Sequence, residues 1–331
     1  MSDYILSVKD LRIYYEMRDG TVKALNGVDL NLRKGTSHGL VGETGAGKTT
    51  LAKGIMGLIP KPHGKIKSGE VLYDGFDLIK ADKHEMRNIR GKHISMIFQD
   101  PMTSLNPVMT VGEQIAEAIR NHEKLSRLEA TKKANTILEL VGIPAARADE
   151  YPHQFSGGMK QRVVIAIALA CNPNLLIADE PTTALDVTIQ AQVLDLIKDL
   201  RTKLGTSMLL ITHDLGVVAQ NCEYVAIMYA GEIVEQGSLR EVFKNGLHPY
   251  TEGLFDSIPK LNEDVDRLKP IEGLMPDPAN LPEGCKFHPR CKYAEEICQC
   301  KVPEEVSINE NHRVCCHRYG AEKEAWKGVS V

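Results

Sequence analysis

The chain has 331 residues with a formal net charge of −4, 25% charged residues and 43% hydrophobic residues, values typical of a globular protein with cores for about two domains. Aromatic residues make up only 5%, which, with the slight acidity, argues against a nucleic-acid-binding surface. The first twenty residues lack the continuous apolar region of a secretory signal. No apolar run reaches the roughly 18 residues of a membrane helix. We therefore expect a cytosolic protein, where disulfides rarely persist.

Apolar runs, Gly-rich turns and amphipathic stretches alternate along the first part of the chain. This rhythm predicts an α/β fold with a largely parallel sheet. Residues 4–17 and 21–32 alternate like antiparallel strands around an Arg-Asp-Gly turn, and 37–59 reads as a strand, a Gly-rich loop and a helix. Residues 103–168 have a helical pattern, which predicts an inserted helical subdomain.

The second half of the pattern begins with a buried strand at 174–181 and an amphipathic helix at 188–204. Another buried strand at 207–214 and a terminal hairpin at 224–237 follow. After about residue 240 Pro, Cys and charge increase and the periodicity fades. We expect an ATPase-type domain over residues 1–240 and a small, separate Cys-rich module over 241–331.

The segment GETGAGKT fits the phosphate-loop pattern G-x-x-x-x-G-K-[ST]. Its glycines allow a tight backbone whose N–H groups face phosphate oxygens, and the following helix adds its positive end. Lys48 is expected to reach the β- and γ-phosphates, and the Thr49 hydroxyl to ligate Mg²⁺. The predicted ATP contacts in this segment are Gly42, Glu43, Thr44, Gly45, Ala46, Gly47, Lys48, Thr49 and Thr50.

Two adjacent carboxylates end the apolar run at 175–178. Asp179 at the strand tip is placed to hold Mg²⁺ directly or through water. Glu180 is then a candidate general base that polarises the attacking water. A plain helix-capping role for the pair is the alternative.

The segment FSGGMKQR (155–162) resembles the signature motif of ATP-binding-cassette (ABC) ATPases, with Met159 where Gln is commonest. A Ser hydroxyl and Gly amides at a helix start form an anion site, although they also suit a simple helix cap. The resemblance implies a P-loop NTPase cassette: a RecA-like core with an antiparallel β subdomain and a helical subdomain. In this family the signature and the D-loop, here ALD at 184–186, contact ATP held by a partner subunit. The implied contacts in trans are Ser156, Gly157, Gly158 and Asp186.

The same resemblance assigns three further positions. Gln99 in MIFQDP looks like the Q-loop residue that contacts Mg²⁺ and water, and His213 in ITHD looks like the switch histidine. With Glu180 and Lys48, they complete the expected catalytic set. Tyr15 occupies the place of the aromatic that stacks on adenine, although Tyr14 is an open alternative because neighbouring strand residues face opposite ways.

Residues 98–115 and 178–197 look like the dipeptide/oligopeptide permease branch of ABC importers. The resemblance implies a peripheral subunit at the cytoplasmic membrane face, a sister cassette in a heterodimer rather than a homodimer, two transmembrane permease subunits and an extracytoplasmic peptide-binding protein. Import of nickel or another small solute is the alternative within the fold. A soluble ABC ATPase of DNA repair or translation is the alternative from another class.

In such importers the segment after the Q-loop receives a coupling helix of a membrane subunit. Here that segment is rich in apolar residues, which is consistent with a docking surface. Ordinary packing of the helical subdomain is the equal alternative. The residues concerned are Met102, Leu105, Val108 and Met109.

Six of the eight cysteines lie in the last fifty residues. The spacing of Cys285, Cys291, Cys298 and Cys316 resembles the C-terminal pattern of the peptide-permease branch, which is associated with a [4Fe–4S] cluster held by four cysteines. Structural zinc, disulfides and unligated thiols are the alternatives, although zinc usually takes C-x₂₋₄-C pairs. Cys300 and Cys315 are surplus. The choice of Cys316 over Cys315 rests on the family pattern alone.

Overall fold

The structure is a computed structural model that describes residues 3–183, 185–257 and 270–320, except for the side chains of Pro101 and Met102. The chain divides into two compact units, each assembled from separate segments. Unit 1 comprises Met1–Leu6, Asn31–Ser37 and Leu72–Thr212, and unit 2 comprises Ser7–Leu30, His38–Val71 and His213–Val331, within the described ranges.

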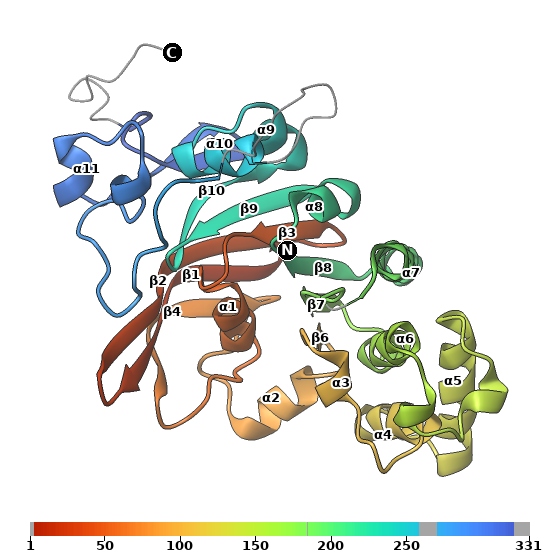
Figure 1. The fold of residues 1–331 in the computed structure, drawn as a ribbon. Coiled ribbons are helices and arrows are strands. Elements are labelled where there is room, and N and C mark those ends of the chain that lie inside the picture. The colour runs from red at the N-terminus through yellow and green to blue at the C-terminus, as the bar shows by residue number, and fades with distance from the viewer. Residues whose placement is uncertain (1–2, 184, 258–269, 321–331) are drawn as a thin grey trace. The chain divides into compact units, whose positions relative to one another are not determined.

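A buried parallel sheet forms the centre of unit 1 (Figure 1). It contains β6 (Ile94–Ile97), β7 (Leu175–Asp179) and β8 (Ser207–Thr212), with β7 in the middle. Every residue of these three strands is buried, which suits a parallel strand covered on both faces. The buried strands expected from the apolar runs are confirmed. The short β5 (Phe76–Asp77) pairs separately with the last residues of β4 (Gly64–Tyr73).

Helices fill most of the rest of unit 1. The central ones, α4, α5 and α6, pack on one another (Figure 1), and they account for the helical pattern at 103–168. Local sequence starts them: Thr110 caps α4, and Ser126 and Glu129 form a reciprocal capping box on α5. The unit contains α2 (Lys83–Ile89), α3 (Pro101–Ser104), α4 (Val111–His122), α5 (Arg127–Leu140), α6 (Gly157–Leu169), α7 (Val187–Leu204) and the 3₁₀ turns η1 (Ala145–Arg147) and η2 (Pro152–Gln154).

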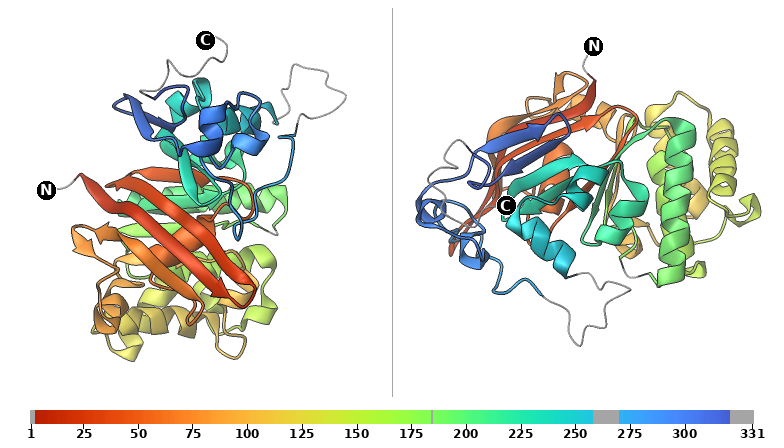
Figure 2. Two further views of the ribbon diagram at one scale, coloured as in Figure 1. Left: turned by 90° about the vertical axis from the view of Figure 1, so that its left-hand side faces the viewer. Right: turned by 90° about the horizontal axis from the view of Figure 1, so that it is seen from above.

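Unit 2 holds most of two sheets. The long strands β1 (Tyr4–Met17) and β2 (Gly20–Arg33) lie side by side with β4, in the order β2-β1-β4 (Figure 2). In the second sheet β3 (Ser37–Val41) pairs in parallel with β9 (Tyr224–Tyr229), and β9 pairs antiparallel with β10 (Glu232–Ser238). The helical elements are α1 (Lys48–Ile55), α8 (Leu215–Asn221), α9 (Leu239–Lys244), α10 (Pro249–Asp256), η3 (His288–Arg290) and α11 (Glu296–Cys300).

The C-terminal segment joins this sheet. Strand β12 (His312–Cys315) pairs antiparallel with β10, and β11 (Glu305–Asn309) pairs with β12. The hairpin β9–β10 is therefore not terminal, because its free edge carries the tail. A separate Cys-rich module is not supported, since the described part of 241–320 belongs to the same unit as β9 and β10. The last part of the expected module, residues 321–331, lies outside the described residues.

A buried carboxylate anchors the tail. The side chain of Glu235 in β10 is 0% exposed. It accepts hydrogen bonds from the Leu247 and His248 amides, both at 2.9 Å, and lies 2.7 Å from Nε2 of His312. Three partners satisfy a carboxylate that would be costly to bury alone. No helix in the described ranges is both long enough and apolar enough to cross a membrane.

Glu232 gives unit 2 a pH dependence. Burial raises the pKa of Glu232 to about 7, against the opposing charges of Lys286 and Arg12. The folded state therefore holds a proton that the unfolded state releases between the ordinary glutamate pKa and about 7, so stability falls as the pH rises through this window. We expect Glu232→Gln to raise the melting temperature at pH 8 and to leave it nearly unchanged at pH 5. Equal shifts at both pH values, measured by differential scanning fluorimetry, would contradict the role of ionisation.

Candidate functional site

The predicted phosphate loop lies between β3 and α1 in unit 2. Gly45 and Gly47 have φ values of 86° and 107°, a region that favours glycine. Gly42 has no room for a side chain, because a Cβ there would lie 2.2 Å from the Met228 carbonyl oxygen. The turn between β9 and β10 contacts the loop: the Gly231 amide of this turn donates a hydrogen bond to the Ala46 carbonyl at 2.9 Å. The sequence therefore produces a tight turn that ends in the first N–H groups of α1.

Lys48 closes this loop on itself. Its side chain is buried, and Nζ donates to the carbonyl oxygens of Gly42 at 2.6 Å and Glu43 at 3.0 Å. Thr49 and Thr50 are half-buried in the first turn of α1, whereas Thr44 is exposed at the loop tip. A buried ammonium, a threonine hydroxyl and a helix N-terminus together suit a bound anion with its metal ion.

The two candidate adenine-stacking tyrosines lie on opposite faces of β1, as strand geometry requires. Tyr14 is on the face of Arg12, with whose guanidinium it interacts. Tyr15 is on the opposite face, and its ring lies beside Gly64 of the neighbouring strand β4, where a Cβ would be 3.0 Å from Cε1 of Tyr15. Both side chains are half-buried.

Two predicted catalytic residues, Gln99 and Glu180, and the predicted Mg²⁺ ligand Asp179 follow or end neighbouring strands at one edge of the unit 1 sheet. Strands β6 and β7 run parallel with Ile97 opposite Ala178, so the residues that follow each strand come together. The Nε2 atom of Gln99 donates to the Glu180 carboxylate at 2.9 Å. Asp179, the last residue of β7, is 2% exposed. The carboxylate of Asp179 and the amide oxygen of Gln99 are oxygen donors of the kind that Mg²⁺ prefers.

Glu180 is held in an unusual backbone conformation, with φ of 47°. Its amide donates to the Ile211 carbonyl of β8 at 2.9 Å, and the Thr183 hydroxyl donates to its carboxylate at 2.8 Å. A left-handed non-glycine residue costs free energy, and such residues cluster at functional sites. The neighbouring strand and Thr183 therefore aim this carboxylate. Capping of α7 falls instead to Asp186, so the capping alternative does not describe Glu180.

The signature segment begins α6. Ser156 is the residue before the helix, it is exposed, and its side chain makes no capping hydrogen bond. Gly157 is also exposed, while Gly158 permits close packing, because a Cβ there would lie 2.6 Å from Cγ2 of Ile189 in α7. Asp186 caps α7 by accepting from the Ile189 amide at 3.0 Å. Ala184 of the D-loop lies outside the described residues.

The remaining single predictions have mixed outcomes. His213 is exposed between β8 and α8, next to Asp214, which caps α8. In the expected docking segment Val108 is 78% exposed, but Leu105 is 5% exposed. Leu105 therefore belongs to the core, as the packing alternative expected, and the Met102 side chain lies outside the described residues.

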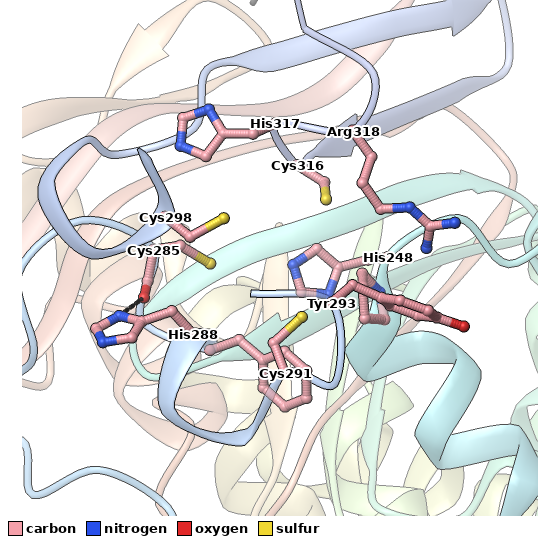
Figure 3. Close-up of a pocket in the computed structure, with 11 residues that line it drawn as sticks. His248, Cys285, His288, Cys291, Tyr293, Cys298, Cys316, His317 and Arg318 are labelled. Atoms are coloured by element: carbon pink, nitrogen blue, oxygen red, sulfur yellow. Dashed lines mark hydrogen bonds between the residues drawn. The ribbon is translucent and has the colours of Figure 1, made fainter. Parts of the chain in front are cut away.

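The four predicted cluster cysteines line one pocket of unit 2. Figure 3 shows the sulfurs of Cys285, Cys291, Cys298 and Cys316 pointing toward a common space. The backbone ties the segments together, since the Cys285 amide donates to the Cys298 carbonyl at 2.9 Å. Within the described ranges, no three His, Cys, Asp or Glu side chains lie close enough to hold a single metal ion.

Burial is the largest influence on the pKa values of the cysteine thiols in this pocket. Burial raises the pKa of the Cys285 and Cys316 thiols to about 12, because a thiolate is poorly solvated there. Three sulfurs nevertheless accept a hydrogen bond from the backbone N–H two residues later, namely Cys285 from Phe287, Cys291 from Tyr293 and Cys316 from Arg318. These bonds stabilise negative charge on sulfur.

The surplus cysteines lie elsewhere. Cys315 ends β12 opposite Glu305, and its charged surroundings include Glu305, Glu232 and Asp29. The Cys300 Sγ is directed to the carbonyl of Glu296 at 3.4 Å in α11. Neither residue lines the pocket. The tertiary structure thus places Cys316, but not Cys315, at the pocket. The sequence offered only the family pattern for choosing between these two adjacent residues.

Comparison with known proteins matches residues 25–183 to the ABC transporter family and residues 234–298 to the oligopeptide/dipeptide transporter C-terminal region. The oligopeptide transport ATP-binding protein OppD of Bacillus subtilis is 52% identical over 313 residues, 94% of this chain and 87% of OppD. The chain belongs to the ABC transporter ATP-binding subunits. The dipeptide transport ATP-binding protein DppD of the same organism is 48% identical over 94% of both chains.

A solved structure agrees with this assignment. The ATP-binding cassette MJ0796, in a dimeric post-hydrolysis state bound to ADP and Pi, has a TM-score of 0.64 and 31% identity, and the match covers 71% of this chain and 99% of that one. The ABC cassette fold expected from the sequence is confirmed. The chain is therefore an ABC-type ATPase that uses ATP.

Sequence reasoning missed three residues of this ABC subunit. Thr183 holds Glu180, and its signal was its place three residues after the carboxylate in the same loop. Tyr250 and Arg290 contact Glu43 of the phosphate loop from the C-terminal segment. No pattern near residue 43 could indicate these contacts, because they join positions more than 200 residues apart.

Proposed function

We propose that this ABC ATPase powers the import of dipeptides or oligopeptides. The oligopeptide/dipeptide transporter match at 234–298 carries the proposal, because this region lies outside the cassette common to ABC proteins. Relatives named for oligopeptide and dipeptide transport, aligned over 94% of this chain, support it. The same observations favour transport over DNA repair or translation, and peptides over nickel.

The residues of unit 2 are proposed to bind the nucleotide. The N–H groups of Gly42–Thr50 and the Lys48 ammonium hold phosphate oxygens, and Tyr15 supports the adenine ring. ATP bound there supplies the phosphoryl group whose hydrolysis releases free energy. Thr49 offers a hydroxyl ligand to Mg²⁺.

The residues of unit 1 are proposed to carry the chemistry. Glu180 accepts a proton from the attacking water, and Gln99 keeps that carboxylate oriented through the 2.9 Å hydrogen bond. Asp179 and the amide oxygen of Gln99 provide oxygen ligands for Mg²⁺. His213, the first residue of the last segment of unit 2, is proposed to assist hydrolysis as the switch histidine of the resemblance.

The signature segment is proposed to act on a second cassette. Ser156, Gly157 and Gly158 begin α6 with an exposed hydroxyl and exposed backbone, which suits the γ-phosphate of ATP held by a partner. Asp186 lies at the adjacent start of α7 and would join the same interface. The dimeric state of MJ0796 supports this arrangement, and we propose a sister ABC subunit as the partner.

The assembly is proposed to comprise the two cassettes, two transmembrane permease subunits and an extracytoplasmic peptide-binding protein. The subunit then lies peripherally at the cytoplasmic membrane face. Exposed Val108, in the loop after Gln99, is proposed to contact a permease helix. The boundary between the cassette and its accessory region is proposed near residue 240.

The cysteine pocket is proposed to hold a [4Fe–4S] cluster. An all-thiol set of four donors in one pocket fits such a cluster, and N–H bonds to the sulfurs are a means by which proteins tune it. The ligands would be Cys285, Cys291, Cys298 and Cys316, and the cluster would supply structural support to the tail.

Uptake measurements test the proposed substrate. In cells lacking the chromosomal gene, a plasmid copy should restore uptake of labelled dipeptides or oligopeptides, and a Lys48→Ala copy should not. Nickel uptake should be equal in all three strains. Restored nickel uptake with no effect on peptides would contradict the proposal and favour the small-solute alternative.

A further inference from the structure

The phosphate loop of unit 2 is contacted at Glu43 by two residues of the C-terminal segment. The Glu43 amide donates to the Tyr250 hydroxyl at 3.0 Å. The Glu43 carboxylate pairs with Arg290, whose Nη1 lies 2.9 Å from one oxygen and 3.3 Å from the other. One loop residue is thus held through both its backbone and its side chain.

Arg290 is rigidly placed. Its side chain is 5% exposed. Nε donates to the Glu272 carbonyl at 3.0 Å and Nη2 to the Ile271 carbonyl at 3.3 Å, while the guanidinium carbon lies 5.8 Å from the Tyr229 ring centre. Because these hydrogen bonds already fix the guanidinium of Arg290, its pairing with Glu43 costs little additional side-chain entropy. This arginine is built to present a fixed positive charge to Glu43.

An aromatic cluster connects this contact to the cysteine pocket. The rings of Tyr229, Tyr250 and Phe287 lie 4.7 to 5.4 Å apart, centre to centre. Phe287 is 3% exposed and follows Cys285 by two residues, while Arg290 directly precedes Cys291. The cysteine segment therefore rests against the same packed rings that orient the Tyr250 hydroxyl.

We propose that Arg290 and Tyr250 are positioning residues for ATP binding, through which the cysteine segment holds the phosphate loop in its binding conformation. The inference rests on the proposed role of Gly42–Thr50 in holding ATP. Arg290 also neutralises a carboxylate that lies within the loop itself. Without it, the Glu43 charge would repel the phosphates, and this repulsion is strong where water is partly excluded. Tyr250 fixes the loop backbone, so that less order has to be gained on binding.

The test measures ATP affinity of the purified chain by equilibrium binding of a fluorescent ATP analogue. Arg290→Gln should weaken binding about tenfold, which equals about 1.4 kcal/mol. Tyr250→Phe should weaken it about threefold, as expected for one lost hydrogen bond. Glu43→Gln in the Arg290→Gln background should recover most of the lost affinity, because it removes the unpaired charge. In the assembled transporter, KM for ATP should rise while kcat stays unchanged, since the loss is one of uniform binding.

Three comparisons decide the outcome. Lys292→Gln, two residues further along and 60% exposed, should bind ATP as the unchanged chain does. If Lys48→Ala abolishes binding and Arg290→Gln does not alter it, the inference is wrong while the proposed ATP site stands. If Lys48→Ala leaves binding unchanged, the proposed site itself fails. The double variant Glu43→Gln/Arg290→Gln provides the last comparison. If it keeps the melting temperature of the unchanged chain but does not recover ATP affinity, the charge argument is wrong.

Discussion

Replacing Glu180 with glutamine is expected to lower the ATPase rate of the assembled transporter by about 10²- to 10⁴-fold. Glutamine has nearly the same shape and keeps an oxygen for the Thr183 hydroxyl, which lies 2.8 Å away. It cannot accept a proton from water. The substitution changes none of the phosphate-loop residues Gly42–Thr50. ATP should therefore still bind and should accumulate unhydrolysed.

Phosphate release and retained nucleotide measure the two parts of this result. Glu139→Gln, an exposed glutamate of α5, is the control and should hydrolyse ATP normally. Thr183→Ala should lower the rate less than Glu180→Gln does, because it only loosens the carboxylate. Full activity of Glu180→Gln would exclude the proposed general base.

Replacing Cys316 with serine is expected to abolish iron binding, whereas replacing Cys315 should leave it intact. The two thiols are adjacent in sequence, but only Cys316 lines the pocket with the other three cysteines. A [4Fe–4S] cluster requires four ligands, and serine is a poor substitute for a thiolate. The Cys315→Ser and Cys316→Ser variants have the same composition and length, and their substitutions are at adjacent positions. Their comparison therefore separates a specific ligand from a general effect of losing one thiol.

Iron and sulfide analysis after anaerobic purification, together with visible absorption, provides the measurement. The unchanged chain and Cys315→Ser should be brown, and Cys316→Ser should be colourless. Stoichiometric zinc without iron in the unchanged chain would contradict the cluster and restore the zinc alternative. Equal iron in both variants would exclude Cys316 as a ligand.

Much of the site was predictable because its residues are local. The phosphate loop is a contiguous segment whose glycines and lysine act within nine residues, and the strand tips of β6 and β7 are marked by apolar runs that end in polar residues. The contact of Gln99 with Glu180 also follows from pattern, because parallel neighbours deliver their following residues to one edge. Leu105 was less predictable, since an apolar residue in a loop suits both a core and a docking surface.

The sequence by itself determined the α/β class, the phosphate loop, the carboxylates after β7 and the presence of four candidate cluster cysteines. These features depend on short-range periodicity and on residue chemistry, which a chain carries in any conformation. Only the tertiary structure decided that β12 extends the sheet beside β10 and that Cys316 rather than Cys315 faces the pocket. It also decided that Arg290 pairs with Glu43, 247 residues away. Pairings of that kind depend on strand register and on packed side chains, which bring distant residues together without leaving a local pattern.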